Sequence, residues 1–264
     1  MLIVELNTVN QPKPQYLINS TANGDRKLVF LLREGQGPAV IWLGGFRSDM
    51  RATKAEALDA WAQKNGHAFL RLDYSGHGES DGRFEDGTIS DWLSDALAVI
   101  RERGGPSPVL VGSSMGGWLA LLAARALAGS PSAPSALVLI APAVDFTEKL
   151  MWASMSEEQR RTISETGQLL VPSAYGEPYP ITRRLIEDGS SHNLFGAPIR
   201  PGCPVSILQG MQDPDVPWQH ALELVEHLPG EATTVTLIKD GDHRLSRPQD
   251  IDLLVNTVDR AVRA

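Results

Sequence analysis

Short apolar runs, rich in β-branched residues, alternate with longer amphipathic segments along most of the chain. Glycine, proline or polar residues bound each run, a pattern that is typical of short buried strands. The predicted strands are 28–32, 39–43, 68–72, 109–112, 136–140, 205–209 and 233–238. Strands that alternate with helices imply right-handed crossovers, so we expect an α/β fold with a mostly parallel, doubly wound sheet that helices cover on both faces.

Two of the intervening segments show clear helical spacing. From Ile89 onward the apolar residues recur at positions i, i+3, i+4, i+7, i+8 and i+11, which places them in one stripe of a helix. Thr88, with Asp91 after it, resembles the capping box at the start of such a helix. A second apolar stripe, 251–258, follows Pro248, and a proline is tolerated in the first turn of a helix.

The segment 145–200 interrupts this alternation. It contains no clear strand, and its polar stretches 156–166 and 181–188 favour helices between several prolines. A structureless loop of this length would be unusual in a compact domain. We therefore expect residues 1–264 to form a single α/β domain, with a small helical cap, or lid, inserted at 145–200.

Composition and charge exclude several classes of protein to which this chain could belong. The 264 residues are 42% hydrophobic and 21% charged, enough to bury a core without disulfides or structural metals. Lys and Arg number 24 against 32 Asp and Glu, a net charge of −8 with no basic cluster, so we expect no nucleic-acid partner. The single cysteine, Cys203, excludes an internal disulfide and the cysteine clusters of zinc sites.

The start of the chain carries no signal-peptide pattern. No apolar run reaches the ~18 residues that a membrane span requires. We therefore expect a cytoplasmic location and no membrane span, whereas these features leave the oligomeric state open.

The most informative segment is 109–119, an apolar run followed by Gly112-Ser113-Ser114-Met115-Gly116 and then a helix rich in alanine and leucine. In a Gly-x-Ser-x-Gly turn between strand and helix, the serine takes a strained backbone conformation that exposes its hydroxyl, and the glycines remove side chains that would collide. We therefore predict that Ser114 is a nucleophile. Ser113 lies one position off the glycine spacing and is expected to point elsewhere.

A nucleophilic serine needs a histidine base, which in this arrangement comes last in the chain order Ser, acid, His. His243 is the predicted base because it lies in a loop just after the strand 233–238, where ligand-site residues collect. His192 falls in the expected cap, and His220 and His227 lie on a predicted helix and are expected at its surface or facing a partner.

The acid that orients the base is expected in the turn after the strand 205–209. Asp213 and Asp215 compete for this role, and we favour Asp213 because it lies nearer the end of the strand. Asp240 and Asp242 are neighbours of the histidine in sequence but are expected to be solvated loop charges.

Backbone N–H groups are the expected stabilisers of an oxyanion. Met115 opens the helix after the serine, so its N–H can face the reacting carbonyl oxygen. The loop after the strand 39–43 contains Gly44-Gly45-Phe46, whose glycines let the backbone approach a substrate, and we predict Phe46 as the second donor.

Together these residues resemble the α/β-hydrolase superfamily. The motifs that carry the likeness are Arg71-Leu72-Asp73-Tyr74-Ser75-Gly76-His77-Gly78-Glu79-Ser80-Asp81-Gly82, Gly112-Ser113-Ser114-Met115-Gly116-Gly117-Trp118, Gly210-Met211-Gln212-Asp213 with Val216-Pro217-Trp218-Gln219, and Asp242-His243-Arg244. From about Gly35 to the C-terminus, the chain is similar to mitochondrial enzymes of this superfamily described as acyl-protein thioesterases (depalmitoylases) and mycophenolic acid acyl-glucuronide esterases.

This resemblance implies the α/β-hydrolase fold, with nucleophile, acid and base at Ser114, Asp213 and His243. His77 is expected to shape a loop beside the pocket. The absence of a transit segment and the acidic, alanine-rich composition suggest a bacterial relative, so the mitochondrial location is not carried over.

The expected function is a serine hydrolase that cleaves acyl thioesters or carboxylic esters through an acyl-enzyme intermediate, with a small-molecule ester or thioester or an S-acylated protein as substrate. This chemistry requires no cofactor and no metal. The alternatives are a carbon–carbon bond hydrolase or a peptidase on the same fold, or a non-catalytic ligand-binding module. The apolar cap residues either line an acyl pocket or cover the cap's own apolar face; they are Met151, Trp152, Met155, Leu169, Leu170 and Tyr175.

Overall fold

A computed structural model describes residues 11–21, 24–173, 176–230 and 232–264, with eight of its strands in one sheet of order β1-β2-β4-β3-β5-β6-β9-β10. These strands are β1 (Gln15–Thr21), β2 (Gly24–Arg33), β3 (Gln36–Leu43), β4 (His67–Leu72), β5 (Val109–Ser113), β6 (Ala136–Ile140), β9 (Val205–Gly210) and β10 (Thr233–Ile238). All the predicted strands are confirmed. β1 was not predicted because it is an edge strand with few buried residues, and Tyr16 and Ile18 are exposed on it.

The sheet is mostly parallel, as expected. From β4 through β3, β5, β6 and β9 to β10, neighbouring strands are parallel, whereas β1 and β2 form an antiparallel hairpin and β2 is antiparallel to β4. The carboxyl ends of the parallel strands therefore meet at one edge of the sheet, where loops from distant parts of the sequence come together.

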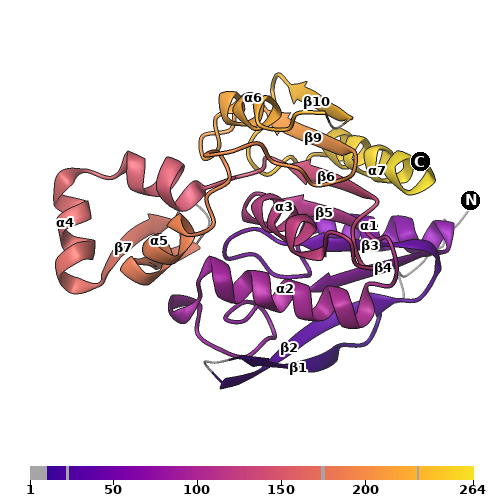
Figure 1. The fold of residues 1–264 in the computed structure, drawn as a ribbon, viewed down its shortest axis with the longest axis horizontal. Helices are drawn as coiled ribbons and strands as arrows, with labels where there is room; N and C mark the ends of the chain where they lie inside the picture. The colour runs from indigo at the N-terminus through magenta and orange to yellow at the C-terminus, as the bar shows by residue number, and fades with distance from the viewer. Residues whose placement is uncertain (1–10, 22–23, 174–175, 231) are drawn as a thin grey trace, which may run out of the picture.

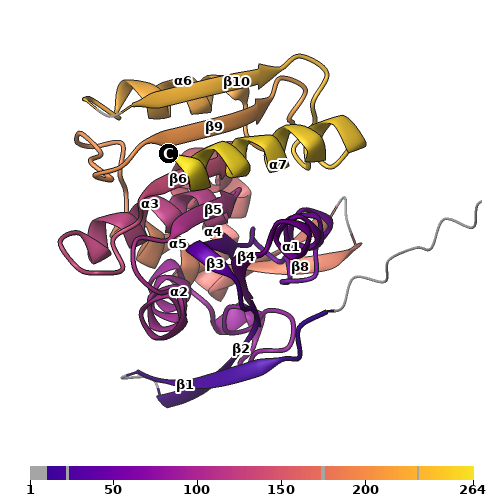
Figure 2. The ribbon, with the colours of Figure 1, turned by 90° about the vertical axis from the view of Figure 1, so that its right-hand side faces the viewer.

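Helices cover both faces of the sheet (Figure 2). They are α1 (Thr53–Asn65), α2 (Ile89–Arg103), α3 (Met115–Leu127), α6 (Trp218–Glu226) and α7 (Pro248–Arg263), with a short 3₁₀ turn at Phe84–Asp86. Side chains of α2, α3 and α6 pack in one core with Leu110, and side chains of α1 and α7 pack in another core with Val109 and Val111. Alternate residues of β5 thus enter opposite cores, and each such buried side chain stabilises the fold by ~1.5–3 kcal/mol. None of the described helices is long and apolar enough to span a membrane.

The insertion between β6 and β9 stands out from the body as a cap (Figure 1). It contains a π-helical turn (Thr147–Trp152), α4 (Glu157–Thr166), β7 (Gln168–Ser173), β8 (Gly176–Thr182) and α5 (Arg183–Ser190). The expectation of a purely helical cap is therefore wrong, because β7 and β8 form an antiparallel hairpin. The strand β8 was not predicted because Pro178 and Pro180, which lack the N–H that a strand donates, argue against a strand in the sequence. Because they lie two residues apart, their missing N–H groups face the same, open side of β8.

A buried ion pair joins α1 to two strands of the sheet. The Asp59 carboxylate, fully buried on α1, accepts two hydrogen bonds of 2.8 Å from the guanidinium of Arg33 at the end of β2. Arg71 of β4, also fully buried, lies 3.4 Å from the same carboxylate. Removing one partner of such a buried pair leaves the other charges without compensation.

We expect Asp59→Ala to lower the free energy of unfolding by ~3–5 kcal/mol, because the buried guanidinium of Arg71 and the partly buried one of Arg33 would lose this carboxylate. Urea unfolding followed by circular dichroism measures this change. Gln63→Ala, which changes an exposed residue of the same helix, serves as the control and should change stability by less than ~0.5 kcal/mol. Equal stability of the two variants would contradict this account of the ion pair.

Candidate active site

The turn between β5 and α3 holds Ser114 in a left-handed backbone conformation. Its φ is 55° and its ψ is −119°, a region that costs a non-glycine residue ~1–3 kcal/mol. The glycines of the motif are needed for contact reasons: a Cβ on Gly112 would lie 2.2 Å from the Gly116 carbonyl oxygen, and one on Gly116 would lie 2.0 Å from the Leu43 carbonyl oxygen. The Ser114 N–H donates to the Ile140 carbonyl at 2.8 Å, which fixes the turn against β6.

The structure brings Ser114, His243 and Asp213 together from three different loops. Asp213 Oδ2 lies 2.8 Å from Nδ1 of His243, and Nε2 of His243 lies 3.1 Å from Ser114 Oγ. Because a carboxylate can only accept, Nδ1 carries the proton, and Nε2 is left as an acceptor for the Ser114 hydroxyl. The arrangement can remove a proton from Ser114 and stabilise the imidazolium that results.

The Asp213 carboxylate is held by its own loop. Its Oδ1 accepts 2.8 Å hydrogen bonds from the backbone N–H groups of Asp215 and Val216, and its Oδ2 accepts from Gln209 Nε2 at 3.2 Å. Asp215, the competing candidate, is exposed and is not the carboxylate that bonds to His243. Gln209 was not predicted, although a polar residue at the end of an apolar strand was a signal that could have found it.

The loop that carries His243 is tied to the Asp213 loop and to α7. The Gln212 N–H donates to the Gly241 carbonyl at 2.8 Å, and the Asp242 carboxylate accepts from the Leu245 N–H at 2.9 Å. Arg247, at the start of α7, pairs with Asp240 at 2.7 Å. Asp240 and Asp242 therefore shape this loop and do not bond to the histidine ring.

The two predicted oxyanion donors, Met115 and Phe46, lie on segments next to Ser114. Met115 is the first residue of α3, and the loop 44–46 packs against the serine, since a Cβ on Gly45 would lie 3.4 Å from Ser114 Cβ. Among the described residues, neither the Met115 nor the Phe46 N–H has a recorded hydrogen-bond partner. Both donors are therefore available to a substrate oxygen.

His77 holds the loop that contains Phe46. Its side chain is buried, and burial lowers its pKa from 6.5 to about 4, so the ring is neutral. Nδ1 donates to the Ser75 carbonyl at 3.2 Å, and Nε2 accepts the N–H of Arg47, the residue after Phe46, at 3.2 Å. The histidine expected to shape a loop beside the pocket thus fixes the backbone that follows Phe46.

An aromatic cluster lies next to this loop. The Phe46 ring makes edge-to-face contacts with Phe84, Trp92, Phe146 and Tyr179 at centroid distances of 4.9 to 5.8 Å. Tyr179 comes from β8, so the cap contributes to the cluster. Trp92 and Phe146 are buried, whereas Phe46, Phe84 and Tyr179 are partly exposed, so the cluster is mainly a packed aromatic core that ties the loop 44–46 to the cap.

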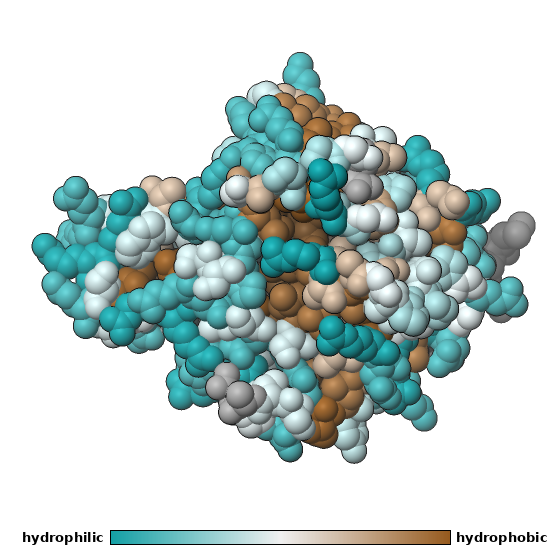
Figure 3. All heavy atoms as spheres, viewed as in Figure 1, coloured by the Kyte–Doolittle hydropathy of each residue, from teal (hydrophilic) through white to brown (hydrophobic). Residues whose placement is uncertain are grey.

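Most of the predicted cap residues pack within the cap itself. Its small core contains the buried Met155, Ile163 and Ile181, with Trp152, Leu169 and Met151 packed against them. Met151 also packs against the main core, Leu170 is 65% exposed, and Tyr175 lies outside the described residues. In Figure 3 the visible surface of the cap is mostly hydrophilic. The cap therefore mainly covers its own apolar face, and it contacts the body through Met151, Tyr179 and Leu185 among other residues.

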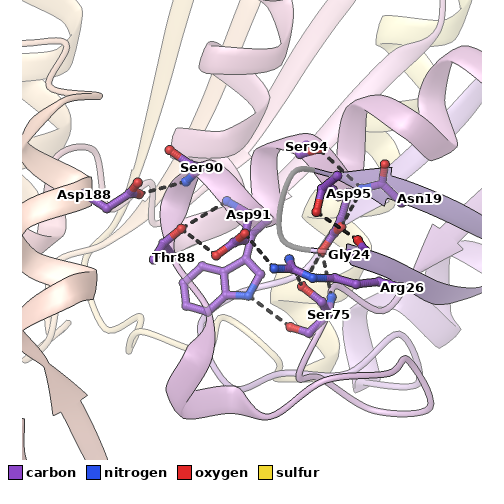
Figure 4. A network of polar contacts seen from close by, with 12 residues as sticks. Asn19, Gly24, Arg26, Ser75, Thr88, Ser90, Asp91, Ser94, Asp95 and Asp188 are labelled. Carbon is purple, nitrogen blue, oxygen red and sulfur yellow. Dashed lines mark hydrogen bonds and ion pairs between the residues drawn. The ribbon is translucent and has the colours of Figure 1, made fainter.

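Helix α5 fastens the cap to the start of α2 (Figure 4). The Asp188 carboxylate accepts the Ser90 N–H at 2.9 Å, and Arg184 lies 3.2 Å from Asp91. Asp91 also pairs with Arg26 of β2 at 2.9 Å. These contacts place the cap, and with it Tyr179, relative to the body.

The two ends of the cap meet at Asp145. Its buried carboxylate accepts the N–H groups of Leu194 and Phe195 at 2.8 and 3.0 Å, and burial raises its pKa. His220 was expected at the surface, but it is only 6% exposed and donates from Nε2 to the neighbouring Val144 carbonyl at 2.9 Å. The helix periodicity did not reveal this because the partner comes from a loop distant in sequence.

Asp213, Asp215 and His243 are the described residues whose donor atoms have the spacing of a metal site, within 4.8 Å of one another. Asp213 and His243 bond to each other through atoms that a metal would need, and backbone N–H groups occupy the other Asp213 oxygen. The donor set therefore fits a hydrogen-bonded acid and base better than a metal centre.

Comparisons with known proteins identify the family to which this fold belongs. Residues 40–252 match the alpha/beta hydrolase family. The palmitoyl-protein thioesterase ABHD10 of Bos taurus, a mitochondrial protein, is 37% identical over 88% of this chain and 75% of its own length. A proposed hydrolase from Agrobacterium vitis S4 superposes with a TM-score of 0.91 and 46% identity, covering 95% of this chain and 98% of its own. The mouse alpha/beta hydrolase domain-containing protein 10 gives a TM-score of 0.86 and 34% identity over the same shares of the two chains.

A pH series of unfolding measurements tests the state of His77. Because burial lowers its pKa from 6.5 to about 4, the unfolded chain binds the proton first as the pH falls. His77 therefore destabilises the fold progressively between pH 6.5 and about pH 4, by at most ~1.4 kcal/mol per pH unit. His77→Gln keeps a donor and an acceptor but does not take up a proton, so we expect it to lose less stability than the wild type across this range. Parallel curves for the two proteins would show that His77 does not titrate as described.

Proposed function

The chain belongs to the alpha/beta hydrolase family and is a hydrolase of ester or thioester bonds; we propose that it cleaves them through Ser114, His243 and Asp213, by way of an acyl-enzyme. The observation that carries the proposal is the pair of hydrogen bonds at His243: Nδ1 donates to Asp213 at 2.8 Å, and Nε2 accepts from the Ser114 hydroxyl at 3.1 Å. Their order matches the roles of orienting acid, base and nucleophile.

In the first step, His243 Nε2 takes the Ser114 proton while Oγ attacks the substrate carbonyl carbon. Asp213 stabilises the imidazolium, and the N–H groups of Met115 and Phe46 stabilise the oxyanion. The imidazolium then protonates the leaving alcohol or thiol, and an acyl group remains on Ser114. Water attacks this ester with His243 again as base, which releases the acid and restores the serine. This chemistry needs no cofactor.

The proposed substrate is a small acyl thioester or ester, or an S-acylated protein. The partly exposed rings of Phe46, Phe84 and Tyr179, next to the predicted oxyanion donor, support an acyl chain there. The relative from Bos taurus is named a palmitoyl-protein thioesterase, which supports depalmitoylation as the form of the reaction to test first. We also propose a cytoplasmic location, on the grounds of the single cysteine.

Substitution of the three residues tests the mechanism. We expect Ser114→Ala to lower kcat for a p-nitrophenyl ester and a matched acyl thioester by ~10⁴-fold or more, and Asp213→Asn and His243→Ala by ~10³–10⁴-fold. Ser113→Ala is the matched control and should keep most of the activity. Steady-state kinetics on the ester, the thioester and a matched amide would separate this activity from that of a peptidase. Near wild-type turnover in Ser114→Ala would rule the mechanism out.

A second prediction concerns the oxyanion site. Gly116→Ala would place a Cβ 2.0 Å from the Leu43 carbonyl oxygen, so the loop 44–46 must move away from Ser114. Because the Phe46 N–H moves with it, we expect kcat to fall by ~10²–10³-fold. Gly196→Ala is the control, since a Cβ there has nothing within 4 Å. Equal kinetics for the two variants, with both folded by circular dichroism, would exclude a role for this loop.

A further inference from the structure

Lys54 reaches from α1 to the loop that carries His243. It is the second residue of α1, and its ammonium donates to the main-chain carbonyl of Arg244, the residue directly after His243. The two residues are 190 positions apart in sequence. Two other hydrogen bonds of this loop lie before and after Arg244: the Gly241 carbonyl accepts from Gln212, and the Leu245 N–H donates to Asp242. The bond from Lys54 is made at the residue immediately after the histidine.

The loop needs outside support at this position. Leu245 has a φ of 43°, in the left-handed region, which costs a non-glycine residue ~1–3 kcal/mol unless its surroundings impose it. The contact from Lys54 to Arg244 lies next to this strained residue. A loop released here can relax, and the position of His243 would change with it.

Lys54 is partly buried where α1 meets the loop, and its contact with Arg244 lies at the surface. Ile238, Leu245, Leu254 and Asp250 of α7 lie around the same place. Burial and the charge of Arg244 lower the pKa of Lys54 to about 8, against the opposing effect of Asp242 and Asp250.

We propose that Lys54 is a positioning residue, whose bond to the Arg244 carbonyl keeps His243 in line between Asp213 and Ser114. The proposal rests on the function proposed above, because it assigns Lys54 an effect on that histidine. Lys54 has no contact with the reacting atoms and acts through the loop alone.

This role makes the activity depend on the charge of Lys54. Below about pH 8 the amine is charged and donates a charge-assisted hydrogen bond, which is roughly twice as strong as a neutral one. Above about pH 8 the neutral amine holds the carbonyl less firmly, so kcat should decline. Stability should move the other way: since the unfolded chain keeps the Lys54 proton up to pH 10.5, the contribution of Lys54 to stability rises between about pH 8 and pH 10.5. If the bond from Lys54 only stabilised the fold, loss of the Lys54 charge above about pH 8 would lower kcat and the free energy of unfolding together.

Three variants test the proposal, with kcat and KM for an acyl thioester measured across about pH 6–10. Lys54→Arg keeps the charge throughout and should retain activity within about 3-fold while losing the alkaline decline. Lys54→Met should lower kcat about 10-fold at neutral pH, with KM changed less than about 2-fold, and should also lack the decline. Lys64→Met removes an exposed lysine of the same helix and should keep the wild-type profile.

A second measurement covers the case in which Lys54→Met folds poorly. The downfield proton resonance of His243 Nδ1 should keep its shift in Lys54→Arg, and Lys54→Arg should still lack the alkaline decline. A wild-type profile in both Lys54 variants would overturn the proposal. If instead the wild type hydrolyses nothing, or Ser114→Ala is fully active, the proposed function fails and not the role of Lys54.

Discussion

The contact on which the site depends is the close approach of three backbone segments at the end of β5. Gly112 and Gly116 touch across the turn, and Gly116 also lies against the carbonyl of Leu43. No side chain fits between these segments. The tight turn that results holds Ser114 at a positive φ, with its hydroxyl directed away from the packed backbone. The same contact brings the loop with Phe46 beside the serine, so the nucleophile and an oxyanion donor are positioned by one packing constraint.

The parallel sheet supplies the other two groups. β9 and β10 are neighbours, and the loops after them carry Asp213 and His243. Parallel strands end at the same edge of the sheet, so short loops are enough to bring residues that are distant in sequence into contact. Buried groups then hold each loop: Gln209 bonds to Asp213, and His77 bonds to the backbone after Phe46. The strands set the positions of the loops that carry the site residues, and local hydrogen bonds set the orientation of their side chains and N–H groups.

The sequence was most informative where a local pattern has one structural meaning. The apolar runs predicted the strands of the central sheet, and the Gly-x-Ser-x-Gly turn with the order serine, acid, histidine singled out residues that the structure brings together. It was least informative where a residue's surroundings come from elsewhere in the chain. The hairpin of the cap was hidden by Pro178 and Pro180, the burial of His220 depends on Val144, and the contact of Lys54 lies across 190 residues. Such contacts have no local signature.

The central claim is that Ser114 is the nucleophile of a working hydrolase. It is tested most directly by treating the native protein with a fluorophosphonate, which reacts preferentially with an activated serine, and locating the adduct by mass spectrometry of the digested chain. The account predicts a single adduct on the peptide that contains Ser114, and none in Ser114→Ala. An unlabelled wild type, or an adduct on Ser113 or any other residue, would contradict it.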